Sequence, residues 1–237
     1  MRTSLPVLFL RSSLFALLFY PVTVLFVLLC ALSAPFSARL MRRCVRLWGF
    51  SHRMLCYVVL GQKVRIVGAL PEGQKLFVFK HESMFETVDL LCLFAEPLVI
   101  AKQELIDIPG WGWVARRHGV IGLKRDDGAK AILHLRREIA KEAGSGRPVC
   151  LFPEGTRVPH GERPPLRSGF AALYQVLGLP VVPVAIDSGR VSPRHSFLKR
   201  PGIITYEVGE IIPPGLPRHE AEKLAHARIN MLNAMGD

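Results

Sequence analysis

The hydrophobic pattern divides the chain into two parts. The 27 residues from 12 to 38 carry no charge and are mostly apolar, whereas from about residue 63 short apolar runs alternate with helical stretches. A helix as long as the uncharged run would span about 40 Å, more than the roughly 30 Å of a bilayer core. We therefore predict a membrane-anchoring helical segment over residues 1–62 and a globular domain over residues 63–237.

A proline interrupts the uncharged run. Pro21 lies inside it, and proline within a helix favours a kink or break, here near Tyr20. Two interpretations stay open: a tilted, kinked span across the membrane, or a short helical hairpin that enters one leaflet. A cleaved signal peptide fits less well, because the run is long and Pro35 follows the only plausible small-residue cleavage site.

A basic stripe follows the uncharged run. Arg39, Arg42, Arg43 and Arg46 are spaced at i, i+3, i+4 and i+7, and Arg53 follows seven residues later. On a helix over residues 39–60 they share one face. The apolar positions that lie mostly on the other side are Leu40, Cys44, Leu47, Met54, Leu55 and Val58. This face is either an ordinary solvated one or part of a helix lying in the membrane interface, with arginines on lipid phosphates. The adjacent apolar run favours the second interpretation, and the positive-inside rule makes this side cytoplasmic.

The remaining pattern predicts a layered α/β domain. The expected strands are Val64–Gly68, Lys75–Phe79, Leu98–Ala101, Gly119–Leu123, Val149–Phe152, Val181–Ala185 and Ile203–Gly209. Several are nearly continuous apolar runs, which is typical of strands covered on both faces. Helical patterns occupy residues 126–143, 167–177 and 218–235. The expected fold class is α/β, with a mixed, largely parallel sheet flanked by helices and an N-terminal membrane-embedded helical segment.

Charge distribution narrows the choice of partner. The chain has a net charge of +12, no acidic residue precedes Glu72, and residues 1–71 hold nine basic side chains. Residues 72–237 hold 22 basic and 19 acidic side chains. Because the excess positive charge adjoins the apolar run, it favours an anionic lipid surface over a nucleic acid. Five scattered cysteines without a CxxC pair predict free thiols and no zinc site.

The first chemically unusual segment is His81-Glu82-Ser83-Met84-Phe85-Glu86, directly after an expected strand. A histidine backed by a carboxylate can act as a general base. On one straight helix, residues 81 and 86 would point about 140° apart. They meet only if His81 lies in the loop and Glu86 in the first helical turn. The alternative is a surface histidine at a helix start.

Two further strand ends carry candidate anion-binding groups. The first is FPEGTR at residues 152–157, where Gly155 permits a tight turn and Thr156 and Arg157 can donate hydrogen bonds to a phosphate. The alternative is a plain turn with a surface arginine. The second is Lys124-Arg125, just ahead of a helix start, where cations disfavour the helix unless an anionic ligand binds; the alternative is a solvated helix start.

Together, the His81-x4-Glu86 spacing, FPEGTR and the VVPVA strand at 181–185 resemble the lysophosphatidic acid acyltransferase family, glycerolipid acyltransferases that make phosphatidic acid. The resemblance covers roughly Val64 to Pro214. It implies that a fatty acyl group passes to the free hydroxyl of lysophosphatidic acid. The donor would be an acyl thioester, carried either on coenzyme A (acyl-CoA) or on acyl carrier protein. The resemblance implies no other cofactor, no metal and no covalent acyl-enzyme.

The resemblance also implies residue roles. His81 would deprotonate the acceptor hydroxyl, and Glu86 would orient and charge-stabilise His81. The residues expected to shape the site for the acceptor phosphate are Arg125, Glu154, Gly155, Thr156 and Arg157, with Lys124 and Arg167 assisting.

Two positions depart from the family pattern. The first motif usually ends in Asp, and here Glu86 takes that place, so Glu82 and Asp89 are alternative partners for His81. The second motif usually has an aromatic residue where this chain has Gly122.

Alternative functions stay open at this point. They are acylation of another lyso-lipid, such as a lyso-ornithine lipid, acylation of glycerol phosphate, and a catalytically inactive membrane protein that binds lipid phosphates.

Overall fold

Seven strands form a mixed sheet in the order β1-β7-β6-β2-β5-β3-β4. The computed structural model describes residues 4–124 and 127–233. The strands are β1 (Gln62–Val67), β2 (Leu76–Phe79), β3 (Leu98–Lys102), β4 (Val120–Leu123), β5 (Val149–Leu151), β6 (Val181–Ile186) and β7 (Gly202–Val208). All neighbours pair in parallel except β6 and β7. The seven predicted strands are confirmed, with each end shifted by no more than two residues.

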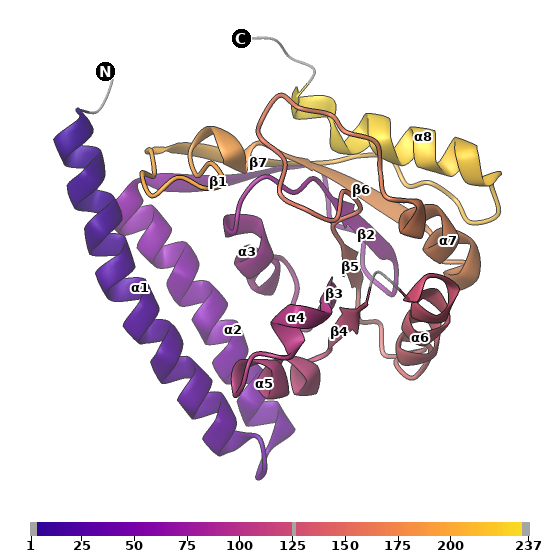
Figure 1. The fold of residues 1–237 in the computed structure, drawn as a ribbon, viewed down its shortest axis with the longest axis horizontal. Helices are drawn as coiled ribbons and strands as arrows, with labels where there is room; N and C mark the ends of the chain where they lie inside the picture. Colours follow the sequence, from indigo (N-terminus) through magenta and orange to yellow (C-terminus); the bar gives the residue numbers. More distant parts are fainter. Residues whose placement is uncertain (1–3, 125–126, 234–237) are drawn as a thin grey trace.

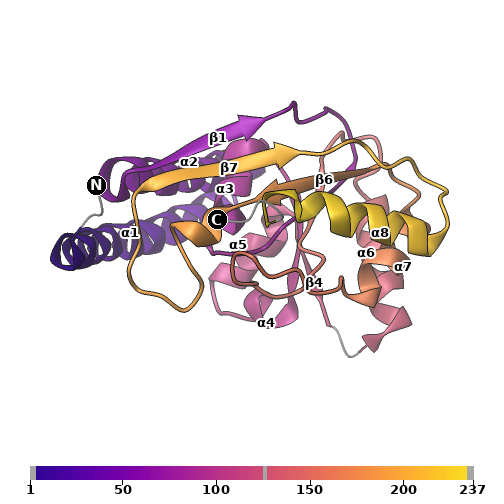
Figure 2. The same cartoon turned by 90° about the horizontal axis from the view of Figure 1, so that it is seen from above.

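Helices cover both faces of the sheet (Figures 1 and 2). They are α1 (Leu5–Ser33), α2 (Ala38–Leu55), α3 (Phe85–Leu93), α4 (Gln103–Ile106), α5 (Trp111–His118), α6 (Ala129–Ala140), α7 (Ser168–Leu177) and α8 (Arg218–Ile229). Short helical turns are η1 (Cys56–Leu60), η3 (Ser188–Arg190) and η4 (Met231–Asn233). The helices predicted over 126–143, 167–177 and 218–235 are therefore confirmed with tighter bounds, while the parts of these predictions on residue 126 and beyond residue 233 lie outside the described residues.

Strand β2 shows why the central strands read as continuous apolar runs. Leu76 and Val78 pack with α6, α7 and α8 in one hydrophobic core. Phe77 and Phe79, which point to the opposite face, pack with α1, η1 and α3 in a second core. Because side chains alternate between the faces and both faces are covered, every position of the strand is apolar.

The N-terminal helix is longer and less interrupted than the sequence predicts. Helix α1 continues from Leu5 to Ser33 with Pro21 inside it, so the predicted break near Tyr20 is wrong. Proline removes one backbone hydrogen bond, and packing on α2 supports the helix beyond it: Trp48 Nε1 donates to Thr23 Oγ1 at 3.0 Å. The chain turns instead at residues 34–37, and α2 returns alongside α1 (Figure 1). The helical hairpin is thus made by α1 and α2 together, not within residues 12–38.

The basic stripe of α2 is divided between two environments. Arg42 pairs with Glu96 at 3.0 Å, and Arg53 pairs with Asp89 at 2.6 Å, so both arginines hold α2 against the globular domain. Arg39, Arg43 and Arg46 are exposed. The prediction that all five arginines form one lipid-facing surface is therefore wrong for two of them. Through η1 the hairpin leads into β1, where the predicted division between residues 62 and 63 falls.

Candidate active site

Three neighbouring strands place the candidate residues at one edge of the sheet. His81 follows β2, FPEGTR follows β5, and Ser188 follows β6. These strands are adjacent and parallel in the order β6-β2-β5. Loops at the carboxyl ends of adjacent parallel strands gather at the same edge, which is where α/β sheets bind ligands.

His81 and Glu86 form the predicted pair. His81 Nδ1 lies 2.9 Å from Glu86 Oε1, and the side chains are 16% and 0% exposed. His81 is in the loop and Glu86 in the first turn of α3, the one arrangement in which the five-residue spacing brings them together. A carboxylate at Nδ1 makes this nitrogen the donor, so the neutral ring carries its lone pair on Nε2. Nε2 can then accept a proton from a hydroxyl group.

Glu86 folds back over the start of its helix. Its Oε1 also accepts hydrogen bonds from the backbone N–H groups of Glu82 at 2.7 Å and Ser83 at 2.6 Å. Its Oε2 accepts from the Ser188 hydroxyl at 2.7 Å. These donors hold both oxygens of the carboxylate in place.

The two alternative partners of His81 are engaged elsewhere. Glu82 contacts His160 Nδ1 at 3.1 Å and accepts from the Gly189 N–H at 2.8 Å. Asp89 accepts hydrogen bonds from Nε and Nη2 of Arg53, at 2.6 and 2.7 Å, and from the Tyr206 hydroxyl at 2.9 Å. Glu86 is therefore the carboxylate that pairs with His81.

The FPEGTR loop holds the backbone and the ring of His81. The His81 N–H donates to Glu154 Oε2 at 3.0 Å, and the Val158 N–H donates to the His81 carbonyl at 2.7 Å. The imidazole stacks on Phe152, with ring centroids 4.2 Å apart. The two motifs are thus parts of one structure, in which the second loop positions the histidine of the first.

Glu154 faces inward. Its Oε1 accepts from Lys80 Nζ at 2.6 Å, and both side chains are fully buried. Lys80 also donates to Asn230 Oδ1 and to the Glu162 carbonyl, each at 2.8 Å. Burial raises the pKa of Glu154, while the Lys80 ammonium and the His81 N–H oppose that rise. Glu154, predicted to help shape a phosphate site, thus faces away from solvent and supports the loop that carries His81.

Cations gather beside this loop without an acidic partner among the described ion pairs. Arg157 is half-buried, and the Arg194 guanidinium donates to its carbonyl oxygen. Lys199 lies near it: burial, and next the Arg157 charge, lower the pKa of Lys199. Lys199 also lines a cavity of about 30 Å³ with Ser83 and Met84 of the His81 loop. Arg157 and Lys199 thus bring positive charge to the same edge as His81.

The other predicted site residues lie at the same edge or flank it. Gly155 adopts the left-handed conformation with φ of 69°, as the tight turn requires, and Thr156 beside it is exposed. Arg167 is exposed at the start of α7, and its N–H donates to the Pro153 carbonyl at 2.9 Å. Lys124 is exposed after β4, three strand spacings from β2 in the sheet, which is about 14 Å. Arg125 lies outside the described residues.

Gly122 has a local explanation. A Cβ atom at this position would lie 2.1 Å from Gln103 Oε1. The Gln103 side chain, at the start of α4, occupies the space that an aromatic residue would need. The second departure from the family pattern therefore coincides with a different side chain filling that part of the site.

Several residues of this arrangement were not predicted from the sequence. Lys80, Ser188 and Lys199 carry no short-range motif, and each meets its partner through the strand order. The available signal for Lys80 is its position in the sequence, directly after the apolar run Leu76–Phe79 and before His81. A lysine buried at such a place needs a carboxylate partner.

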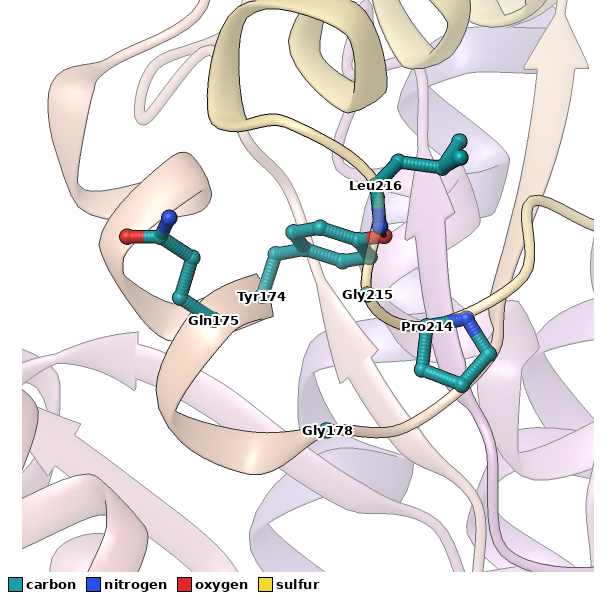
Figure 3. Close-up of a pocket in the computed structure, with 6 residues that line it drawn as sticks. All are labelled: Tyr174, Gln175, Gly178, Pro214, Gly215 and Leu216. Carbon is teal, nitrogen blue, oxygen red and sulfur yellow. Dashed lines mark hydrogen bonds between the residues drawn. The ribbon is translucent and has the colours of Figure 1, made fainter.

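A larger hollow than the one at Lys199 lies elsewhere. It measures about 520 Å³ and lies between the end of α7 and the segment before α8 (Figure 3). Its Tyr174 hydroxyl donates to the Pro213 carbonyl at 2.7 Å and accepts from the Leu216 N–H at 2.9 Å. Gly178, on its rim, precedes the start of β6, so the hollow lies at the opposite edge of the sheet from His81. Within residues 4–124 and 127–233, no group of three His, Cys, Asp or Glu side chains is placed to hold a metal ion.

Comparison with known proteins adds independent information. Residues 62–187 match the family model described as acyltransferase. A 1-acyl-sn-glycerol-3-phosphate acyltransferase from Pseudomonas aeruginosa is 33% identical over 204 residues, which cover 79% of each chain. A protein of the same name from Helicobacter pylori is 29% identical over 166 residues, 66% of this chain and 70% of that one.

Two further likenesses concern acceptor type and fold. A lyso-ornithine lipid O-acyltransferase from Pseudomonas aeruginosa is 29% identical over 128 residues, 54% of this chain and 48% of that one. The crystal structure of the 1-acyl-sn-glycerophosphate acyltransferase PlsC from Thermotoga maritima matches with a TM-score of 0.75 at 20% identity, covering 96% of this chain and 98% of that one. The structural likeness extends over the helical hairpin and the α/β domain alike.

Proposed function

This chain belongs to the acyltransferase family that includes the 1-acyl-sn-glycerol-3-phosphate acyltransferases, and from that membership we propose that it acylates lysophosphatidic acid to phosphatidic acid. The observation that carries the mechanism is the His81–Glu86 pair, whose Nε2 is left to accept a proton beside a cationic loop. Phosphatidic acid formation places the protein in phospholipid biosynthesis.

The reaction proceeds by direct attack on a thioester. His81 Nε2 takes the proton of the acceptor hydroxyl while its oxygen attacks the thioester carbonyl carbon. The tetrahedral intermediate collapses, the carbon–sulfur bond breaks, and the thiolate takes the proton back from His81. Glu86 stabilises the imidazolium that forms in between, because its carboxylate is buried against Nδ1. The acyl donor is acyl-CoA or acylated acyl carrier protein, and no other cofactor takes part.

The acceptor phosphate binds at the cationic side of the site. Arg157 offers a guanidinium that forms paired hydrogen bonds with phosphate oxygens, and Lys199 adds a second positive charge. An anion there also removes the electrostatic conflict between the two neighbouring cations. Lys124, Thr156 and Arg167 flank this edge and would assist.

The α1–α2 hairpin provides membrane association. Helix α1 has 29 residues and is long enough to cross a bilayer. Its most apolar 18-residue window has a mean hydropathy of 2.6, and only 17% of that window is buried in the protein. A full span would carry the neighbouring arginines of α2 into the hydrocarbon, which is costly. We therefore place the hairpin in the cytoplasmic leaflet, with Arg39, Arg43 and Arg46 at the lipid phosphates. Protease accessibility in right-side-out and inverted vesicles tests this orientation, since cleavage in the inverted ones alone is expected.

An acceptor panel tests the reaction. The purified protein is given a labelled acyl-CoA or acyl carrier protein donor, with lysophosphatidic acid, a lyso-ornithine lipid or glycerol 3-phosphate as acceptor. The expected result is labelled phosphatidic acid from lysophosphatidic acid. Turnover with another acceptor alone would replace the proposed substrate. Binding of lysophosphatidic acid without turnover of any acceptor would support a lipid-phosphate binding protein instead.

A matched pair of variants tests the phosphate site. Arg157→Met is expected to raise KM for lysophosphatidic acid about 10- to 100-fold, because a charge-assisted hydrogen bond contributes roughly 1.5–3 kcal/mol. Arg136→Met removes an exposed arginine of α6 and serves as the control. Equal KM values in the two variants would remove Arg157 from the phosphate site.

A further inference from the structure

We propose that Ser188 is a positioning residue for the acyl transfer: its hydroxyl holds the second oxygen of Glu86 and so fixes the direction in which the first oxygen meets His81. This inference rests on the proposed function, since it concerns how the same base is held. It assigns a role to a serine that lies more than a hundred residues from the His81 motif in the sequence.

The geometry is that of a buried, dedicated contact. Ser188 Oγ lies 2.7 Å from Glu86 Oε2, and both residues are 0% exposed. Ser188 begins η3, two residues after β6 ends, and β6 is the direct neighbour of β2 in the sheet. The strand order therefore delivers the hydroxyl to the loop that carries His81.

The two oxygens of Glu86 have unequal support. Oε1 takes hydrogen bonds from His81 Nδ1 and from two backbone N–H groups, whereas in the described part of the chain the hydrogen bond to Oε2 comes from Ser188. A glutamate has one more rotatable bond than the usual aspartate, and its terminal torsion is broad. Anchoring Oε2 fixes the plane of the carboxylate, and with it the line from Oε1 to the ring. Loss of this donor would leave a buried, charged oxygen unsatisfied.

The turn that carries Ser188 is itself held in place. The next residue, Gly189, donates its N–H to Glu82 Oε2 at 2.8 Å, and a Cβ atom there would lie 2.8 Å from that same oxygen. On the other side, Asp187 Oδ1 accepts from the Thr205 N–H at 2.6 Å. Neighbouring groups therefore hold Ser188 ready before substrate binds, which is what a positioning residue requires.

The first test is kinetic. Ser188→Ala is expected to lower kcat about 10- to 100-fold, as for loss of a hydrogen bond to a charged group, with KM for lysophosphatidic acid unchanged. Ser33→Ala, which removes another buried serine hydroxyl, bonded to the Cys30 carbonyl in α1, is the control and is expected to keep the wild-type kcat. A change in KM with constant kcat, or wild-type kinetics in Ser188→Ala, would overturn the proposal.

A double-mutant cycle with Glu86→Asp shows whether Ser188 acts through the carboxylate. The side chain of aspartate is one methylene group shorter, so we expect it to lose the contact with Ser188. Adding Ser188→Ala to the Glu86→Asp protein is then expected to change kcat less than about 3-fold. The same fold-loss in both backgrounds would mean that Ser188 acts independently of Glu86, and the proposal would fall.

A spectroscopic readout separates this proposal from the proposed function. The proton on His81 Nδ1, identified by its loss in His81→Ala, is expected to shift in the NMR spectrum of Ser188→Ala and to stay unchanged in Ser33→Ala. If wild-type protein acylates none of the acceptors, the function fails while this measurement still decides the role of Ser188. If the alanine variant does not fold, Ser188→Cys keeps a side chain of similar size with a weak donor and carries the same expectation. An unshifted resonance overturns the proposal.

Discussion

At the scale of single residues, the Glu86 side chain shapes the loop that carries His81. The side chain folds back to accept the N–H groups of Glu82 and Ser83, which precede the helix. A helix start leaves such N–H groups without partners, and a carboxylate in the first turn satisfies them. The same oxygen then meets His81 without any change in the five-residue spacing. His81, two N–H groups of the loop and the Ser188 hydroxyl all contact this one carboxylate.

Removal of the proposed base tests this arrangement directly. His81→Ala is expected to lower kcat by at least about 10²- to 10⁴-fold, the range supplied by general-base catalysis, while vesicle binding stays at the wild-type level. His134→Ala removes an exposed histidine of α6 and is the matched control. Substantial turnover in His81→Ala would assign proton transfer to another group.

A second residue-scale prediction concerns pH and stability. Burial, helped by the nearby Arg147 and Arg42 charges, lowers the pKa of His118 from 6.5 to about 4. In the unfolded chain this histidine binds a proton below pH 6.5, whereas in the folded protein it stays neutral until about pH 4. Its contribution to stability is therefore present above pH 6.5 and is lost as the pH falls toward 4.

Denaturant unfolding of the detergent-solubilised protein at pH 7 and pH 5 measures this contribution. The free energy of unfolding lost between these two pH values is expected to be about 2 kcal/mol smaller in His118→Phe than in wild type. His219→Phe, at an exposed position of α8, is expected to retain the full loss. An identical loss in wild type and His118→Phe would contradict the assignment.

At the scale of elements, a buried ion pair joins the ends of two strands. Lys80 directly follows β2 and precedes His81, Glu154 belongs to the loop after β5, and Asn230 follows α8. One ammonium group thereby connects the sheet to the C-terminal helix. This explains why the FPEGTR segment affects the histidine loop even though its acidic residue faces away from solvent.

The cost of breaking this pair is measurable. Glu154→Gln leaves the Lys80 ammonium buried without a compensating charge, so the free energy of unfolding is expected to fall by about 3–5 kcal/mol. Glu162→Gln changes an exposed acid in the segment between β5 and α7, to which Glu154 also belongs, and is expected to have little effect on stability. The experiment is denaturant unfolding of both variants beside wild type, and equal stabilities would show that Lys80 does not depend on Glu154.

At the scale of the whole molecule, apolar surface and positive charge are concentrated on the α1–α2 hairpin. Leu10 and Leu17 of α1 are 67% and 72% exposed in a helix with few buried positions. Exposed apolar side chains in such density mark a lipid contact rather than a solvated face. The hairpin is also joined to the α/β domain by the Arg53–Asp89 pair, so membrane binding and the position of the active site are mechanically linked.

The corresponding prediction concerns the introduction of charge into this apolar surface. Leu10→Lys/Leu17→Lys is expected to reduce binding to anionic phospholipid vesicles at least 10-fold, because placing a charged side chain in the hydrocarbon region is costly. Activity toward a short-chain, soluble lysophosphatidic acid is expected to remain. Leu133→Lys, at an exposed leucine of α6, is the control. Unchanged vesicle sedimentation of the double variant would locate the membrane anchor elsewhere.

The sequence by itself determined the seven strands, the helical patterns at 126–143, 167–177 and 218–235, and the pairing within the first motif, but not α4 or α5. Strand positions follow from apolar runs of four to seven residues, and the contact between His81 and Glu86 follows from five residues of chain at a helix start. Both depend on short-range geometry, in which residue type and spacing leave few alternatives. The family resemblance has the same origin, since its motifs are the loops at strand ends.

Only the tertiary structure decided which distant groups meet. Nothing local predicts that α1 continues through Pro21, that Arg42 and Arg53 turn toward the α/β domain, or that Ser188 reaches Glu86. Each depends on packing between elements far apart in sequence: α2 against α1 and α3, and β6 beside β2. The free energy of such contacts comes from burial and from satisfying buried charges, and these are properties of the assembled layers, not of any single segment.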